Sequence, residues 1–265
     1  MSRISKSFRE WRHPRRCYVV CALSRSGSNL LTDGLRETCR AGKPNQFFLP
    51  NFVAGFAAKH GLDADNDFAG YVRGIVSRTV TGNGVFGFKA MGWYLEQFIA
   101  KLRQTGAFGA ANTPDLEMLR SAFPSLQFLR IVRRNKLRQA ISKARALQTG
   151  VWKIRPGKTP LAEPRFDPAL IARCLDEIRW EENIWTRFFE AIAVEPFRVE
   201  YEDLCQNYRA RIRSVLDYLE ISVPRNAQIS EPVTARQADE ISLEWEERYL
   251  TLGAPAELQP TFSHV

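Results

Sequence analysis

The residues with the clearest chemistry lie in a short polar loop, Ser24-Arg25-Ser26-Gly27-Ser28, between an apolar run and a segment with helical spacing. A loop of small residues that leads into a helix presents backbone N–H groups and a helix dipole to an anion. Ser26 and Ser28 add hydroxyl donors, and Gly27 allows a close approach of the backbone. Arg25 adds a forked cation that matches phosphate oxygens. The loop therefore predicts a phosphate site, although an ordinary strand-to-helix turn with a serine N-cap fits the same residues.

Such a loop needs a strand before it and a helix after it, and the rest of the sequence repeats that order. Short apolar runs without strict alternation predict strands buried on both faces; they cover 18–23, 85–90, 126–132 and 197–201. Apolar residues at helical spacing predict helices that start at 29 and cover 93–103, 114–122, 136–148, 168–192 and 203–219. Strands that alternate with helices predict an α/β fold, with a parallel β-sheet flanked by helices on both faces. Ligands of such folds bind at the carboxyl ends of the strands, where the loop falls.

Length and charge narrow the class of protein. The chain has 265 residues and a formal net charge of +9, which fits a basic N-terminal tail over 1–16 and a single domain over 17–265. Its basic residues are spread along the chain without a groove-reading motif, so we expect an acidic small molecule as the ligand and no nucleic acid. Five scattered cysteines without a CxxC pair predict reduced thiols and no metal site. Since no apolar leader or membrane-length run appears, we expect a cytoplasmic protein.

The N-terminal tail has a pattern of its own. Ile4, Phe8 and Trp11 stand at helical spacing with basic residues between them. A helix that lies on a membrane surface has this pattern, and so does a short tail that docks on its own domain. Peripheral membrane contact and a docked tail both stay open at this point.

Five segments, in this order, resemble the bacterial trehalose-sulfotransferase-like family of carbohydrate sulfotransferases. They are Arg25–Leu31, Gly42–Phe48, Gly87–Met91, Arg133–Ser142 and Arg236–Asp239. The resemblance runs from about Cys17 to Tyr249 and implies a P-loop-like sulfotransferase fold. It implies an enzyme that transfers a sulfuryl group from 3′-phosphoadenosine 5′-phosphosulfate (PAPS), without a metal, to a hydroxyl of a carbohydrate or glycolipid acceptor. Members of this family can form homodimers.

The resemblance also implies which residues hold the 5′-phosphate and the sulfuryl group. Arg25 would bind the leaving 5′-phosphate. The loop and the helix start would form its cradle, through Ser26, Gly27, Ser28 and Asn29. Lys89, which ends a predicted strand, would lie near the sulfuryl group or the acceptor; a solvated lysine at a strand end is the plainer reading.

The 3′-phosphate would be held by Arg133 and Ser142, with Arg236 and Gln237 from a segment near the C-terminus. Arg134 competes with Arg133, because it stands eight residues before Ser142, the usual spacing in animal cytosolic sulfotransferases. Arg133 matches the trehalose-type register and is favoured here. A cation at a helix start opposes the dipole unless an anion binds there, which favours a binding role for these arginines.

The sequence departs from the family at Gln46, where the family has a glutamate as its proposed general base. An amide does not accept a proton at neutral pH, although it can orient an acceptor hydroxyl. His60 is one chemically suitable substitute. The alternative is a weak or inactive module that binds PAPS or its product, adenosine 3′,5′-bisphosphate. A P-loop kinase is a third reading, opposed by the lack of a Gly-Lys-Ser/Thr ending in the loop and of a clear Mg²⁺-binding partner.

Overall fold

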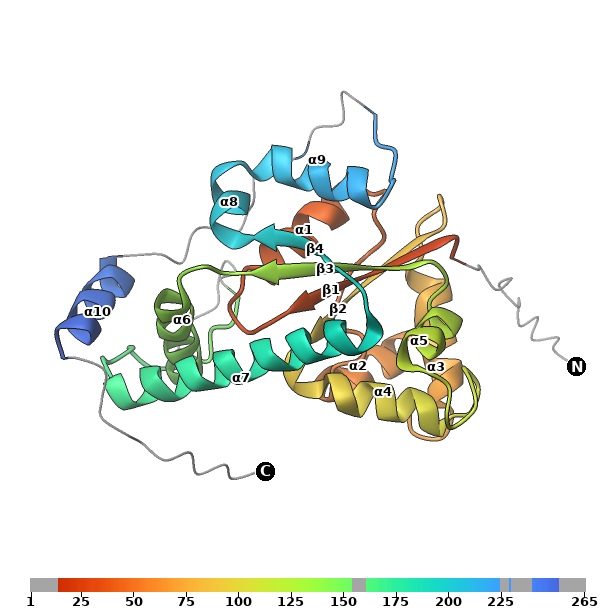
Figure 1. The fold of residues 1–265 in the computed structure, drawn as a ribbon, viewed down its shortest axis with the longest axis horizontal. Coiled ribbons are helices and arrows are strands. Elements are labelled where there is room, and N and C mark those ends of the chain that lie inside the picture. The colour runs from red at the N-terminus through yellow and green to blue at the C-terminus, as the bar shows by residue number, and fades with distance from the viewer. Residues whose placement is uncertain (1–13, 154–160, 225–228, 230–239, 253–265) are drawn as a thin grey trace, which may run out of the picture.

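The computed structural model describes residues 14–153, 161–224, 229 and 240–252, and its sheet has the strand order β2-β1-β3-β4 (Figure 1). The strands are β1 (Arg16–Ala22), β2 (Val85–Met91), β3 (Leu126–Val132) and β4 (Phe197–Glu200). Every pair is parallel, so the carboxyl ends of the strands lie at one edge. The predicted α/β fold with a parallel sheet is therefore confirmed.

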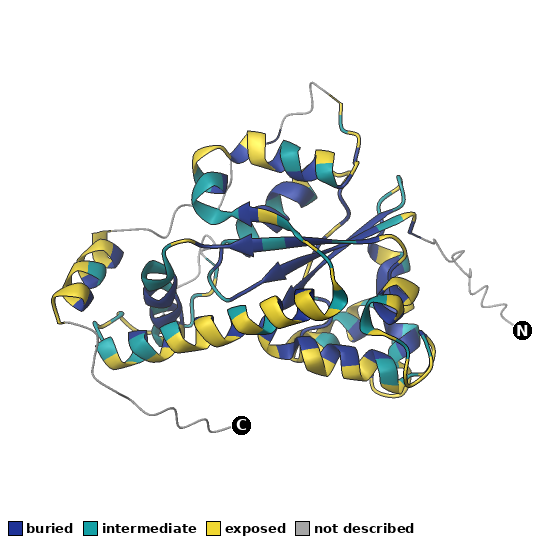
Figure 2. Ribbon diagram, in the orientation of Figure 1, coloured by how far each residue is buried: buried dark blue, intermediate teal, exposed yellow. Residues whose placement is uncertain are grey.

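Helices cover both faces of this sheet (Figure 1). They are α1 (Ser28–Glu37), α2 (Pro50–His60), α3 (Phe68–Thr79), α4 (Leu95–Gln104), α5 (Asp115–Ala122), α6 (Lys136–Thr149), α7 (Pro168–Ile192), α8 (Tyr201–Gln206), α9 (Tyr208–Tyr218) and α10 (Glu240–Thr251), with a 3₁₀ turn, η1 (Gly92–Tyr94), after β2. Figure 2 shows the strands almost wholly buried and the outward sides of α7 and α9 exposed. No described helix is long and apolar enough to cross a membrane.

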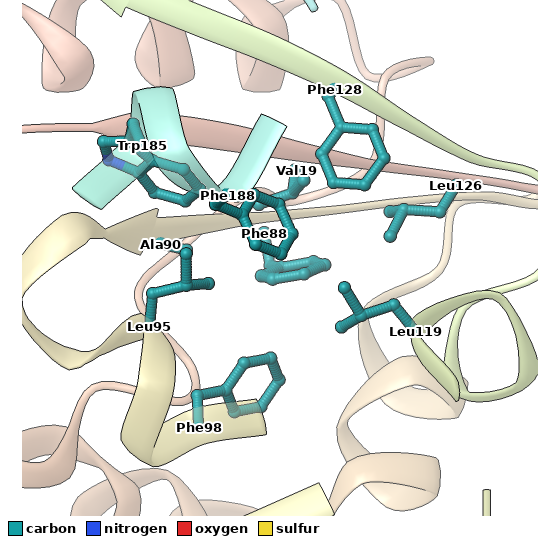
Figure 3. Close-up of a pocket in the computed structure, with 10 residues that line it drawn as sticks. All are labelled: Val19, Phe88, Ala90, Leu95, Phe98, Leu119, Leu126, Phe128, Trp185 and Phe188. Atoms are coloured by element: carbon teal, nitrogen blue, oxygen red, sulfur yellow. The ribbon is translucent and has the colours of Figure 1, made fainter. Parts of the chain in front are cut away.

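Successive side chains of β1 point to opposite faces of the sheet, so their contacts show which helices cover each face. Val19 is in register with Phe88 of β2 and Phe128 of β3. Figure 3 shows these three side chains around a small apolar cavity, together with residues of α4, α5 and α7. The next residue toward the N-terminus, Tyr18, points to the other face, where its hydroxyl donates to the carbonyl of Ala41, just beyond α1 (2.6 Å). The cavity is thus part of the core, and α1 lies on the opposite face of the sheet.

The predicted helix over 203–219 is wrong in its bounds. Two helices, α8 and α9, cover this stretch, and α8 already begins at Tyr201, which the sequence assigned to a strand. The break falls at Asn207, whose backbone leaves the helical region (φ −125°, ψ 43°) and whose side-chain amide donates to Asp203 (2.8 Å). Asparagine competes for backbone partners in this way and therefore favours helix ends.

Two helices, α2 and α3, were not predicted. In α2 only Ala57 is buried, so this helix lacks the apolar stripe that marks a helix in a sequence. In α3 two glycines lower the helix propensity. At one of them, Gly74, a Cβ would lie 2.4 Å from the end of the Leu62 side chain, which would have to move. The last described helix, α10, begins at Glu240.

Candidate active site

The loop after β1 ends in a helix N-terminus that no side chain caps. The N-cap residue of α1 is Gly27, with φ 88°, and the first turn of α1 holds no acidic residue. By contrast, Asn135 caps α6 by accepting from the backbone N–H of Arg138. Uncapped N–H groups at a helix start are free to donate to an anion. The structure therefore leaves the predicted phosphate loop open at the point where a phosphate would bind.

Ser26 holds the loop in this shape. Its side chain is buried, and its hydroxyl donates to the carbonyl of Leu23 (2.8 Å), which also accepts from the backbone N–H of Ser26 (3.2 Å). The hydroxyl of Ser26 is therefore engaged within the loop. Its backbone and those of the next residues make up the loop that the sequence predicts as the phosphate cradle.

Tyr201 is a residue of this site that sequence reasoning missed. A Cβ on Gly27 would lie 2.3 Å from Cδ2 of Tyr201, so the ring packs directly on the loop. The guanidinium carbon of Arg133 lies 4.7 Å from the centroid of the same ring, a cation–π distance. Tyr201 therefore lies next to both the loop after β1 and the arginine after β3. The signal available in the sequence is the strand predicted over 197–201, which ends at Tyr201.

Arg25 turns toward α6. Its backbone is left-handed (φ 61°), and its Nε donates to Oγ of Ser142 (2.9 Å). Burial, together with the nearby charges of Arg133 and Arg145, lowers the pKa of Arg25 to about 10. Cations that lower one another's pKa in a partly buried site favour an anionic ligand, which would relieve their repulsion.

Arg133 and Arg134 have opposite surroundings. Arg133 is only 8% exposed, and its buried Nε has no hydrogen-bond partner among the described residues. Burial is also the main cause that lowers its pKa. The side chain of Arg134 is 58% exposed and pairs with Glu200 (3.3 Å) and Glu202 (3.7 Å). An unsatisfied buried guanidinium N–H is costly without a ligand, so the geometry favours Arg133 over Arg134 as the arginine that faces a phosphate.

Lys89 reaches the N-terminus of α1 from β2. Its Nζ donates to Oδ1 of Asn29 (2.6 Å) and to Oγ of Ser28 (3.3 Å). Burial lowers the pKa of Lys89 to about 7, while the charge of Asp33 acts in the opposite direction. The structure therefore brings two of the predicted cradle residues, Ser28 and Asn29, to the buried amine of Lys89.

Gln46 lies beside Lys89. The backbone N–H of Lys89 donates to the carbonyl of the preceding residue, Asn45 (2.9 Å). The hydroxyl of Tyr71 donates to the carbonyl of the following residue, Phe47 (2.6 Å). The segment with Gln46 is thus fixed along the open edge of β2. The part of the chain described here contains no hydrogen bond or ion pair between His60, at the end of α2, and either Lys89 or Gln46.

Arg236 and Gln237 lie outside the described residues. The helix that follows them, α10, is joined to the start of α6, where Asn135 donates to Glu246 (2.7 Å) and Arg138 pairs with the same carboxylate (2.5 Å). Further along α6, the buried amide of Gln139 donates to the carbonyl of Ser24 (2.8 Å). Helix α6 therefore contacts both the phosphate loop and the C-terminal helix. Within the described ranges, no group of three or more His, Cys, Asp or Glu side chains could hold a metal ion.

A family profile and two sequence relatives agree on one family. A profile of the Stf0 sulphotransferase family matches residues 17–251. The trehalose 2-sulfotransferase of Mycolicibacterium smegmatis is 33% identical over 268 residues, which cover 89% of this chain and 95% of the relative. That of Mycobacterium tuberculosis is 31% identical over 263 residues (88% and 94%). Among solved structures, the sulfotransferase domain from the olefin synthase of Synechococcus PCC 7002 superposes with a TM-score of 0.47 at 13% identity, covering 94% of this chain and 92% of that one.

Proposed function

The chain belongs to the Stf0 sulfotransferase family, as the sequence predicted, and we propose that it transfers a sulfuryl group from PAPS to a hydroxyl of a carbohydrate or glycolipid. One observation supports the donor most strongly. Two buried cations, Lys89 and Arg133, and the half-buried Arg25 surround or adjoin an uncapped helix N-terminus. Such a site suits a small molecule with several phosphate-like charges.

The residues divide between the two ends of the donor. In this proposal the N–H groups from Gly27 to Asn29 and the guanidinium of Arg25 hold the 5′-phosphate. Arg133 and Ser142 hold the 3′-phosphate. The buried Nε of Arg133 has no hydrogen-bond partner among the described residues, and the phosphate supplies one. Arg236 and Gln237 are proposed to complete that end.

The roles proposed for Lys89 and Gln46 follow from the charge that develops during the transfer. When a sulfuryl group leaves a phosphate, negative charge grows on the phosphate oxygens, and fixed cations stabilise it. Lys89 is proposed to supply this stabilisation, since its ammonium is already directed at the helix start. Gln46 is proposed to orient the acceptor hydroxyl by hydrogen bonding, because the segment that contains it lies along β2 next to Lys89. A carbohydrate acceptor is supported by the names of the two relatives, both trehalose 2-sulfotransferases.

Calorimetric titration of the protein tests the donor site. We expect adenosine 3′,5′-bisphosphate to bind and adenosine 5′-monophosphate to bind much more weakly, because only the first satisfies Arg133. Incubation with labelled PAPS and trehalose, followed by chromatography of the sugar, tests the transfer itself. Equal binding of the two nucleotides would overturn the proposal.

A second candidate function rests on the amide of Gln46. A protein that binds the donor without useful turnover would retain the whole cation cluster and lack only a proton acceptor. The Gln46→Glu variant separates the two candidates. A rise in transfer rate with unchanged nucleotide affinity would identify a transferase that lacks its base, whereas an unchanged or lower rate in a turning-over enzyme would indicate that another group takes the proton.

A further inference from the structure

The segment Val151–Lys153 runs from the end of α6 to α1, across the site. At its start, the backbone N–H of Val151 donates to Oγ1 of Thr149 (3.2 Å). In its middle, the carbonyl of Trp152 accepts from Nη1 of Arg25 (2.5 Å). At its end, Nζ of Lys153 pairs with Asp33 of α1 (2.5 Å). Two main-chain hydrogen bonds and one side-chain ion pair therefore fix this segment, which we call the crossing segment.

The crossing segment lies on the side of the site where Lys89 is found. Asp33 stands one turn beyond Asn29, the residue that accepts from Lys89. The charges of Asp33 and Lys153 both act on Lys89, the first raising and the second lowering its pKa. Trp152 is therefore held between the arginine of the phosphate loop and the surroundings of the buried lysine.

The side chain of Trp152 is 43% exposed although its backbone is fixed at the site. A large aromatic surface that remains exposed beside a polar site is a common recognition feature. Pyranose rings present one face of C–H groups, which are attracted to the negative face of an indole, and direct their hydroxyls sideways toward polar groups. An aromatic side chain on a segment whose next residue acts on Lys89 therefore has the chemistry that a sugar ring needs while one of its hydroxyls reacts.

We propose that the indole of Trp152 is the surface on which the acceptor's pyranose ring lies, so that Trp152 determines specificity for sugars. This inference rests on the proposed function, because it takes the sulfuryl group to be transferred near Lys89. The adenine ring of the donor is the other group that could stack on the indole of Trp152. Trp152 directly precedes Lys153, which pairs with Asp33, and the charges of both residues act on Lys89. This proximity to the proposed point of transfer favours the acceptor.

The test uses the full-length protein saturated with adenosine 3′,5′-bisphosphate, titrated with trehalose and with methyl glucoside. We expect Trp152→Ala to weaken sugar binding about tenfold and to leave nucleotide affinity unchanged. Trp152→Phe keeps an aromatic face and should retain most of the affinity, while it should lose the change in tryptophan fluorescence that the sugar causes in the wild type. Trp180→Ala is the matched control, since Trp180 is 45% exposed on α7 and should bind sugar as the wild type does.

Three results would overturn the proposal. Unchanged sugar binding in Trp152→Ala would exclude the indole as the platform. A loss of nucleotide binding in that variant, with sugar binding kept, would assign the indole to adenine. If the wild type binds the bisphosphate but neither sugar, the proposal fails while the donor half of the proposed function stands. A wild type that does not bind the bisphosphate would instead overturn the proposed function itself.

Discussion

Nε of Arg25 donates a hydrogen bond to Oγ of Ser142 at 2.9 Å, which joins the loop after β1 to helix α6, 117 positions further along the chain. The sequence assigned these two residues to opposite ends of the donor. Their contact means that the proposed 5′-phosphate and 3′-phosphate sites share one connected surface. A change at either residue should therefore affect the whole nucleotide.

Ser142→Ala should weaken binding of adenosine 3′,5′-bisphosphate. The variant removes the hydroxyl that accepts from Nε of Arg25 and leaves a part-buried guanidinium N–H without a partner. The free energy of binding should become less favourable by about 1–2 kcal/mol, or roughly tenfold in affinity. Calorimetry measures the change. Ser121→Ala, at an exposed position of α5, is the control and should bind the bisphosphate as the wild type does. Equal affinity in the two variants would show that the Arg25–Ser142 bond does not organise the site.

Arg133→Ala and Arg134→Ala form a matched pair of neighbours. Arg133 is buried with an unpartnered Nε, whereas Arg134 is largely exposed and already paired with two glutamates. We expect Arg133→Ala to bind adenosine 3′,5′-bisphosphate no better than adenosine 5′-monophosphate. The loss should be at least about 2 kcal/mol, in the range of a charge-assisted hydrogen bond. Arg134→Ala should retain the preference, and the reverse pattern would assign the 3′-phosphate to Arg134.

Nucleotide affinity should fall as the pH rises from 7 to 9. The pKa of Lys89 in the free protein lies at about 7, well below its usual value of 10.5, so the amine loses its charge over this range. An anion binds the charged form, and its binding then takes up a proton, so the affinity falls by up to about tenfold per pH unit. Phosphate groups are almost fully ionised above pH 7 and add little to the trend.

Calorimetry in buffers of different ionisation enthalpy measures this proton uptake directly. Lys89→Arg provides the comparison, because a guanidinium stays charged throughout and should remove the pH dependence. A wild-type affinity that is flat from pH 7 to 9 would contradict a titrating Lys89.

Gly27→Ala should disrupt the loop, whereas Gly55→Ala should not. Gly27 has φ 88°, and an added Cβ would lie 2.3 Å from the ring of Tyr201, so both backbone strain and a clash follow. Gly55 is in α2, with nothing within 4 Å of the added Cβ, and alanine there should stabilise the protein by about 0.4–1 kcal/mol. Thermal unfolding measures the stability of both variants, and titration with adenosine 3′,5′-bisphosphate measures their nucleotide affinity. Normal nucleotide binding by Gly27→Ala would show that the loop tolerates a side chain.

The sequence alone determined the strands and the loop that are marked by residues adjacent in the chain. Each predicted strand is present within one or two residues of its expected bounds, because strands buried on both faces leave continuous apolar runs. The phosphate loop follows from five adjacent residues, and the family followed from motifs in a fixed order. Helix α2 gave no such signal, since almost all of its residues are exposed or half-buried.

The tertiary structure decided which side chains meet. Arg133 and Arg134 are adjacent and identical in type, and only the partners supplied by β4 and α8 distinguish them. Tyr201 reaches Gly27 from a strand-to-helix junction far along the chain. Trp152 is placed by bonds to Arg25 and, through its neighbour, to Asp33. Burial and pairing depend on residues that the sequence places far apart, so periodicity and motif spacing give no measure of them.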